Sequence, residues 1–294
     1  MASLKQDKNH KISQNMTLPF YSTTTVSKGK GPVSKLASPL PKKYPRSPLR
    51  YPGGKNRAVS TILRLIPDNE TTLCSPFLGG GSIELASTTR MQVRGYDLFE
   101  PLINFWKILL KKPQELADQV KSFHPLAKQA FYRLQKDFQG IKDDLERAAV
   151  FYVLNRSSFS GTTLSGGMSP GHPRFTESSI DRLRNFSVKS FNVDCLDFSE
   201  SIPINSDAFL YLDPPYLNKQ ALYGINGHTH IDFDHTRLAD MLNQRDRWIL
   251  SYNDCPEVRY LYKDYRIIPL EWVYGMSKDK TSNEVVILSK DVKL

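Results

Sequence analysis

The chain has 294 residues, and its 39% of apolar residues can build one large domain or two. No apolar run reaches the length of a membrane span, the first residues lack the apolar stretch of a signal peptide, and the three cysteines contain no CxxC pair, which argues against membrane, secreted, disulfide-rich and zinc-cluster proteins. The net charge of +10 favours a polyanionic partner, and we expect a cytoplasmic protein.

The positive charge is concentrated at the start of the chain. Residues 1–57 carry twelve Lys or Arg and one acid, and a second basic stretch over 121–189 has eleven basic and six acidic residues. Both are candidates for phosphate contacts. Residues 1–46 are rich in Ser, Thr, Lys and Pro, which is typical of a disordered arm, and a tail without a function explains them equally well.

Strand and helix patterns alternate on both sides of a different middle part, which predicts an α/β fold. The patterns are short apolar runs or apolar residues at helical spacing, bounded by Gly, Pro and Asp. The expected elements are a helix over 58–66, a strand over 71–77, a helix from Ile83, a strand over 92–96, helices over 101–110 and 144–154, strands over 187–193 and 208–212, a helix over 235–242 capped by Asp234, a strand over 247–252, and a closing antiparallel hairpin of 265–273 and 284–289.

The stretch 111–184 interrupts this alternation. It is basic, and around Asn155-Arg156 and before Arg174 it is rich in loops and aromatic residues. We interpret it as an insertion into a catalytic part that consists of residues 47–110 and 185–294.

A glycine turn follows the strand over 71–77. Glycine lets a ligand approach the backbone, so a strand, a glycine turn and a helix start are typical of a nucleotide site. Asp97 ends the next strand sixteen residues past Gly81, close to where an acid meets a ribose diol.

The motif Asp213-Pro214-Pro215-Tyr216 follows the buried run 208–212. Two prolines cannot donate to a sheet ladder, so the strand ends in a stiff turn at the sheet edge where ligands bind. Asp213 and the Pro214 carbonyl can each accept an N–H from an exocyclic amine, and Tyr216 can stack on a planar base. A strand-ending turn with a helix-capping Asp is the alternative.

Three segments, Leu49 to Lys55, Ser75 to Leu85 and Asp213 to Tyr216, resemble in that order the hallmark segments of Dam-type (D12 class, alpha-group) DNA adenine-N6 methyltransferases. The resemblance covers about Leu49 to Ser289. It implies a Rossmann-like S-adenosylmethionine-dependent methyltransferase sheet with an inserted, mainly helical target recognition domain. It also implies S-adenosyl-L-methionine as the cofactor, double-stranded DNA as the partner, flipping of the target base and no required metal.

The resemblance implies a role for each matching residue. Lys55 would meet the cofactor's carboxylate, Asp97 its ribose hydroxyls and Asp194 its adenine, with Asp197 as the alternative because the alignment can slip by three. Pro52 and the three consecutive glycines depart from the usual family pattern. The implied cofactor residues are Tyr51, Lys55, Phe77, Gly79, Gly81, Asp97 and Asp194, the catalytic residues are Asp213, Pro214 and Tyr216, and the DNA-binding residues are Asn155, Arg156 and Arg174.

Other interpretations stay open at this point. A methyltransferase for RNA or for another amino group can use a related turn, and a DNA-binding module without catalysis would share the basic stretches. The cluster of His228, His230, Asp232, Asp234 and His235 suggests a metal, but turn and cap roles explain it better. Glu84 is expected to favour the dipole of its helix. The recognition sequence and a link to a restriction enzyme do not follow from one sequence.

Overall fold

The computed structural model describes residues 43–169, 174–217, 233–270 and 284–293. The arm expected over 1–46 therefore lies almost entirely outside the described residues. Tyr44, which lies within the expected arm, packs against the hydrophobic core, so ordered packing begins before residue 46.

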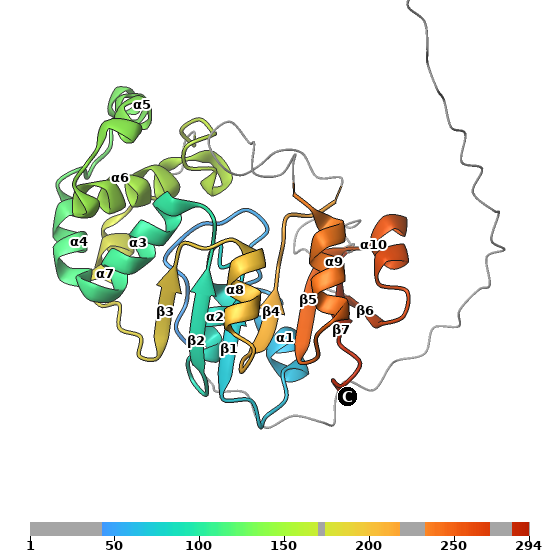
Figure 1. Cartoon of the computed structure of the whole chain (residues 1–294). Coiled ribbons are helices and arrows are strands. Elements are labelled where there is room, and N and C mark those ends of the chain that lie inside the picture. The colour runs from blue at the N-terminus through green and yellow to red at the C-terminus, as the bar shows by residue number, and fades with distance from the viewer. Residues whose placement is uncertain (1–42, 170–173, 218–232, 271–283, 294) are drawn as a thin grey trace, which may run out of the picture. The chain divides into compact units, whose positions relative to one another are not determined.

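Seven strands of the described chain form one sheet in the order β3-β2-β1-β4-β5-β7-β6 (Figure 1). All neighbouring strands are parallel except the pairs that include β7. The four residues of β4 are all buried, as expected for a central strand that is covered on both faces. The strands are β1 (Thr72–Ser75), β2 (Gln92–Tyr96), β3 (Phe191–Asp194), β4 (Phe209–Leu212), β5 (Trp248–Asn253), β6 (Arg266–Leu270) and β7 (Glu284–Leu288).

Helices cover both faces of the sheet, and each face has its own hydrophobic core. Because side chains alternate along a strand, Leu73 and Phe209 belong to the core under α1 (Val59–Leu65), α2 (Ser82–Ser87) and α3 (Glu100–Lys111). Cys74 and Leu210 belong to the core on the opposite face. That core is formed by α8 (Phe198–Ile204), α9 (His235–Asn243) and α10 (Pro256–Leu261).

The middle stretch is helical and lies beyond β3 (Figure 1). It contains α4 (Pro113–Lys121), α5 (Lys128–Asp137), α6 (Asp144–Ser157) and α7 (Glu177–Arg184), with short 3₁₀ turns over Phe138–Gly140 and Phe159–Gly161. Helix α3 contacts α6, and α4 contacts α6 and α7. The buried residues of these helices belong to the same core as α1 to α3, so the helical part is continuous with the sheet domain.

The expected α/β sheet, its helices and its closing hairpin are confirmed, including the cap of α9 by Asp234, which accepts a hydrogen bond from the Arg237 amide. The individual helices α4, α5, α7, α8 and α10 were not predicted. Strand β3 is shorter than expected because Ser190 has a φ of 63°, which ends extended backbone. Helix α6 runs through Asn155 and Arg156, which we had expected in a loop.

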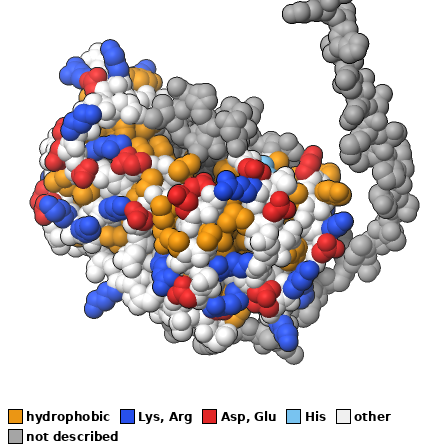
Figure 2. Space-filling view, viewed as in Figure 1, with side chains coloured by type: hydrophobic (Ala, Val, Ile, Leu, Met, Phe, Trp, Pro, Cys, Tyr) orange, Lys and Arg blue, Asp and Glu red, His pale blue; other side chains and the backbone are white. Residues whose placement is uncertain are grey.

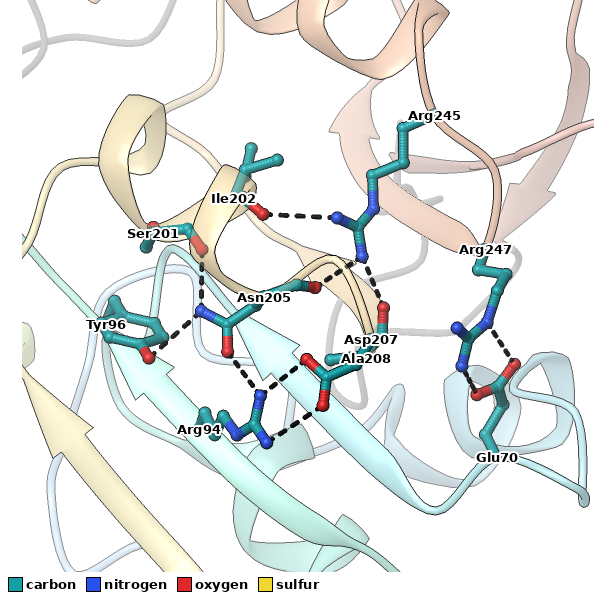
Figure 3. A network of polar contacts seen from close by, with 10 residues as sticks. All are labelled: Glu70, Arg94, Tyr96, Ser201, Ile202, Asn205, Asp207, Ala208, Arg245 and Arg247. Carbon is teal, nitrogen blue, oxygen red and sulfur yellow. Dashed lines mark hydrogen bonds and ion pairs between the residues drawn. The ribbon is translucent and has the colours of Figure 1, made fainter.

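A polar network fixes the edge of the sheet opposite the site (Figure 3). Arg94 of β2 donates to Asn205 and to both oxygens of Asp207, at 2.9–3.1 Å. Arg245 donates to the carbonyls of Asn205 and Ala208. These contacts join the end of α8 to the start of β4, which positions β4 and the motif that follows it.

Candidate active site

A cavity of about 490 Å³ lies at the carboxyl edge of the sheet. The strand order reverses between β1 and β4, and ligands of open α/β sheets bind at this crevice. A volume in the range of about 300–1,000 Å³ is typical of small-molecule sites. The lining residues fall in six segments, which are 51–55, 76–84, 97–99, 196–198, 211–216 and 233–237. The fold therefore brings all three motif segments to one place.

The turn after β4 presents a carboxylate, a carbonyl and an aromatic ring to this cavity. Asp213, Pro214 and Tyr216 all line it, and β4 ends at Leu212 as the prolines predict. The Tyr216 ring stacks on Tyr252 with centroids 5.8 Å apart and planes at 29°. Burial raises the pKa of Tyr216 well above its ordinary value, so its phenol stays neutral.

Lys55 pairs with the carboxylate of this turn. Its Nζ atom lies 2.7 Å from each carboxylate oxygen of Asp213 and 3.0 Å from the Gly53 carbonyl. The same atom lies 5.0 Å from the centre of the Tyr216 ring. The side chain of Lys55 is 5% exposed, so a nearly buried cation neutralises the acceptor of the motif.

The glycine turn is shaped by Tyr51, which lies across it. A Cβ atom on Gly79, whose φ is 47°, would lie 2.9 Å from the Tyr51 ring, and one on Gly80 would lie 2.7 Å from Tyr51 Cβ. Gly81 has a φ of 66° and would meet Trp106 at 3.0 Å. The middle one of the three consecutive glycines, Gly80, is thus required by the close approach of Tyr51.

Asp97 lies beside this turn. Its carboxylate accepts hydrogen bonds from the amides of Gly79 at 2.9 Å and Phe99 at 3.0 Å. Removal from water raises its pKa, against the effect of these two amides. Asp97 lines the cavity as expected and also fixes the glycine turn to the end of β2.

Of the two acids considered for the cofactor adenine, the structure brings Asp197 and not Asp194 to the cavity. Asp194 is 58% exposed, and the ion pair with Lys107 at 2.6 Å lowers its pKa. Asp197 caps α8 by accepting from the Ser199 amide and lines the cavity next to Phe198. Asp194 ends β3, whereas the turn that follows the strand reaches the cavity.

Three aromatic rings form one wall beside Asp197. Phe77, Phe198 and Phe233 have centroids 5.3–5.7 Å apart. Phe77 was expected at the cofactor, and Phe198 belongs to the pair Asp197-Phe198 that was the alternative for the adenine contact. Phe233 was missed because it stands outside any motif, and its only sequence signal is its place next to the capping residue Asp234.

Glu84, which was expected only to favour the dipole of its helix, also lines the cavity. It is 2% exposed, and its Oε1 accepts a hydrogen bond of 2.7 Å from the Ser75 hydroxyl at the end of β1. Burial raises its pKa to about 7, with smaller opposing effects of Asp213, which raises it, and Lys55, which lowers it. The site therefore holds a further acid that the sequence did not single out for binding.

Asn155 lies in the interior, which corrects the expectation of a direct DNA contact. It is 1% exposed, and its Oδ1 accepts from the Arg50 amide at 2.9 Å while its Nδ2 donates to the Arg50 carbonyl at 2.8 Å. The same Nδ2 also contacts the Thr163 hydroxyl. Asn155 thus ties the cofactor-side segment before Tyr51 to the turn after α6.

Arginines gather around this junction. The guanidinium of Arg156 donates to the Arg174 carbonyl at 2.8 and 3.0 Å, and burial together with nearby Arg182, Arg50 and Arg174 lowers its pKa. Arg174 and Arg182 are exposed. The sequence singled out Arg156 and Arg174, whereas Arg50 and Arg182 join them only in the fold.

The turn after α6 also exposes a large aromatic residue. Phe159 is 64% exposed, and its amide donates to the Gly167 carbonyl at 2.9 Å. Gly161 has a φ of 80°, and a Cβ there would lie 2.2 Å from the Arg50 carbonyl. The turn is therefore rigid and packed directly against the segment that enters the cavity.

Within the described ranges, no group of three His, Cys, Asp or Glu residues could hold a metal ion. His228, His230 and Asp232 of the suggested metal cluster lie outside those ranges. No helix of the described chain is long and apolar enough to cross a membrane.

Comparison with known proteins matches residues 51–276 to the family described as D12 class N6 adenine-specific DNA methyltransferase. The chain belongs to this D12 methyltransferase family. The family resemblance seen in the sequence is thereby confirmed. The match begins at Tyr51, the first residue that lines the cavity, and leaves the basic arm outside.

Individual D12-type relatives are distant in sequence. The DNA N-6-adenine-methyltransferase of Escherichia phage P1 is 27% identical over 248 residues, which cover 77% of this chain and 32% of the phage protein. The DNA adenine methylase of Vibrio cholerae is 28% identical over 243 residues, covering 75% of this chain and 86% of the relative. Modification methylase StsI of Streptococcus sanguinis is 26% identical over 252 residues, which cover 78% of this chain and 37% of the relative. The chain thus spans only about a third of two of these relatives.

Proposed function

We propose that this D12 family member transfers a methyl group from S-adenosylmethionine to N6 of adenine within a specific sequence of double-stranded DNA. The observation that carries the proposal is the turn Asp213 to Tyr216 at the edge of a ligand-sized cavity, opposite the glycine turn. A carboxylate and a carbonyl beside an aromatic ring suit a planar ring that bears an amino group. The names of the relatives support adenine in DNA as the acceptor.

The residues around the cavity fit the proposed donor. The glycine turn lets an adenosine approach the backbone, Asp97 suits ribose hydroxyls, and Asp197 beside Phe198 suits the edge and face of an adenine. Lys55 suits a carboxylate. When bound, S-adenosylmethionine supplies an activated methyl group on a sulfonium. We assign the adenine contact to Asp197 in place of Asp194, because only Asp197 lines the cavity.

The chain's own contribution to the chemistry is to prepare a weak nucleophile. The lone pair of adenine N6 is delocalised into the ring, and hydrogen bonds from N6 to Asp213 and to the Pro214 carbonyl favour a pyramidal nitrogen as charge develops. Asp213 is then placed to receive the proton that N6 loses. For this, Lys55 must give up at least one of its two contacts to Asp213.

The target base must leave the duplex to reach this turn, because the amino group of an adenine stacked in DNA is not accessible to the residues that line a cavity. Tyr216 would supply stacking inside. Phe159, exposed on its rigid turn, would fill the space that the base leaves in the duplex. Phe159 follows Ser158, whose carbonyl accepts a hydrogen bond of 2.9 Å from Arg50, and phosphates would bind at the arginine cluster to which Arg50 belongs.

The helical part over 111–184 is the proposed target recognition domain. Figure 2 shows Lys and Arg side chains gathered around α5, together with exposed apolar atoms. Lys128, Arg133 and Lys136 are exposed on this helix. Gln135 of α5 donates to the carbonyls of Thr163 and Gly166 at 2.8–2.9 Å, which couples the helix to the turn that carries Phe159.

Transfer of a labelled methyl group tests the proposal. The purified protein is incubated with methyl-labelled S-adenosylmethionine and either unmethylated duplex DNA or RNA. We expect label in the duplex only, recovered as N6-methyladenine after digestion. Label in RNA, in cytosine or in protein would show that the acceptor is not adenine in DNA. Binding of DNA without any methyl transfer would support a DNA-binding module without catalysis.

A further inference from the structure

Glu84 is a nearly buried acid in the cavity for which the proposed reaction gives no role. It lies in the first turn of α2, directly after the glycine turn, and is 2% exposed. Its single described side-chain partner is the Ser75 hydroxyl at 2.7 Å. Glutamine could make the same bond without the cost of removing a carboxylate from water, so stability alone does not explain an acid here.

The charged groups near Glu84 place it at one end of the cavity. Lys55, from the turn before α1, and Asp213, from the end of β4, both act on its charge, and Tyr211 of β4 faces it as a neutral phenol. The cation and the two acids all line the cavity. Lys55 contacts Asp213 directly, whereas Glu84 contacts Ser75.

An α-amino acid needs a cation and an anion side by side, because its carboxylate and its ammonium group share one carbon atom. Lys55 and Glu84 offer such a cation and anion, because both line the same cavity as the glycine turn. We propose that Glu84 receives the ammonium group of the methyl donor's amino-acid end, while Lys55 receives its carboxylate. This inference rests on the proposed function and assigns the acid that the motif comparison left out.

The assignment also explains how Asp213 becomes available. When Lys55 turns to the donor's carboxylate, Asp213 loses its cation and can accept the N6 hydrogen of adenine. Glu84 then carries the negative charge that balances the donor's ammonium.

Calorimetric titration with two thioethers tests the role of Glu84. S-adenosylhomocysteine carries the amino-acid end, and 5′-methylthioadenosine has the same nucleoside without it. Glu84→Gln keeps the side-chain volume and the hydrogen bond to Ser75. We expect it to lower the affinity for S-adenosylhomocysteine about tenfold and to change the affinity for 5′-methylthioadenosine by no more than about twofold. Glu70→Gln is the matched control, since Glu70 is a buried acid paired with Arg247 at the opposite edge of the sheet (Figure 3).

The pH dependence separates binding from a packing role. Because the ionised form of Glu84 would bind the ammonium, the affinity of the wild type for S-adenosylhomocysteine should rise from pH 6 to 8. Ser75→Ala removes the hydrogen bond that lowers the pKa of Glu84, so the rise should move to higher pH. Glu84→Gln should abolish the rise.

Each outcome decides the inference. Equal weakening of both ligands by Glu84→Gln, no weakening of either, or an unchanged pH profile in Ser75→Ala would overturn it while the proposed function stands. If the wild type binds neither thioether, the inference and the proposed function fail together.

Discussion

The side-chain nitrogen of Lys55 lies 2.7 Å from both carboxylate oxygens of Asp213, although the two residues are 158 positions apart in the chain. The pair closes the cavity between the first and the last motif segments. Because Lys55 is 5% exposed and Asp213 21% exposed, loss of one partner leaves the other charge poorly solvated. Removal of one partner of a buried pair costs up to about 3–5 kcal/mol of unfolding free energy.

Asp213→Asn should abolish methyl transfer without unfolding the protein. Asparagine keeps an acceptor for Lys55 but lacks the charge that stabilises the developing cation at N6, so we expect a loss of at least about a thousandfold in turnover. The affinity for S-adenosylhomocysteine should stay within about threefold. Asp213→Ala should also lose activity, with a lower midpoint of unfolding because Lys55 is left unpaired. Full turnover of either variant with labelled donor would refute the catalytic assignment.

The free energy of unfolding should depend on pH through the titration of Glu84. Burial raises its folded pKa to about 7, above the unfolded value, so the folded state binds more protons between about pH 4.5 and 7 and stability falls as pH rises through this window. Glu84→Gln removes this penalty. Relative to the wild type, the variant should gain up to about 3 kcal/mol at pH 8 and little at pH 4.5, as measured by urea unfolding. A gain that does not change with pH would contradict a raised pKa.

Gly80→Ala should disturb the cofactor turn. The new Cβ would lie 2.7 Å from Tyr51 Cβ, so Tyr51 must shift. Such overpacking costs about 1–3 kcal/mol. We expect this cost to appear as a lower affinity for S-adenosylhomocysteine and, in part, as a lower free energy of unfolding. Gly140→Ala is the matched control, because a Cβ at Gly140 meets nothing within 4 Å. Similar affinities of the two variants would show that Tyr51 does not shape the site.

Phe159→Ala should weaken the binding of duplex DNA and the flipping of the target base, and it should leave binding of the methyl donor unchanged. Under the proposed function, the exposed ring fills the gap that the flipped base leaves in the duplex. A stacking aromatic residue contributes about 1–3 kcal/mol, which the substitution would remove. We expect a tenfold or larger rise in KM for duplex DNA and a smaller 2-aminopurine signal at the target position. Tyr260→Ala removes an aromatic residue that is 73% exposed on α10 and should change neither quantity. An equal effect of the two substitutions would argue against a specific role for Phe159.

Local patterns predicted much of the sheet and the centre of the site. The buried run before Asp213 and the double proline determine a strand and its end, and the glycine turn follows from backbone freedom at Gly79 and Gly81. These features depend on neighbours in sequence, so they can be inferred without the fold.

The parts that were missed depend on distant contacts. The choice of Asp197 over Asp194 follows from where β3 ends, and Ser190 ends its extended backbone on the other side. The ion pair of Lys55 joins two segments that are 158 positions apart, and Asn155 is buried against the backbone of Arg50 and the turn after α6. The raised pKa of Glu84 comes from packing that one sequence does not display.

The central claim is that the turn Asp213 to Tyr216 methylates adenine in DNA. Its most direct test is to incubate unmethylated plasmid DNA with the protein and S-adenosylmethionine and to map modified bases at single-base resolution, with Asp213→Asn in parallel. We predict N6-methyladenine at one recurrent sequence with the wild type and none with Asp213→Asn. Methylcytosine, unmodified DNA with a folded and donor-binding wild type, or equal N6-methyladenine from both proteins would contradict the claim.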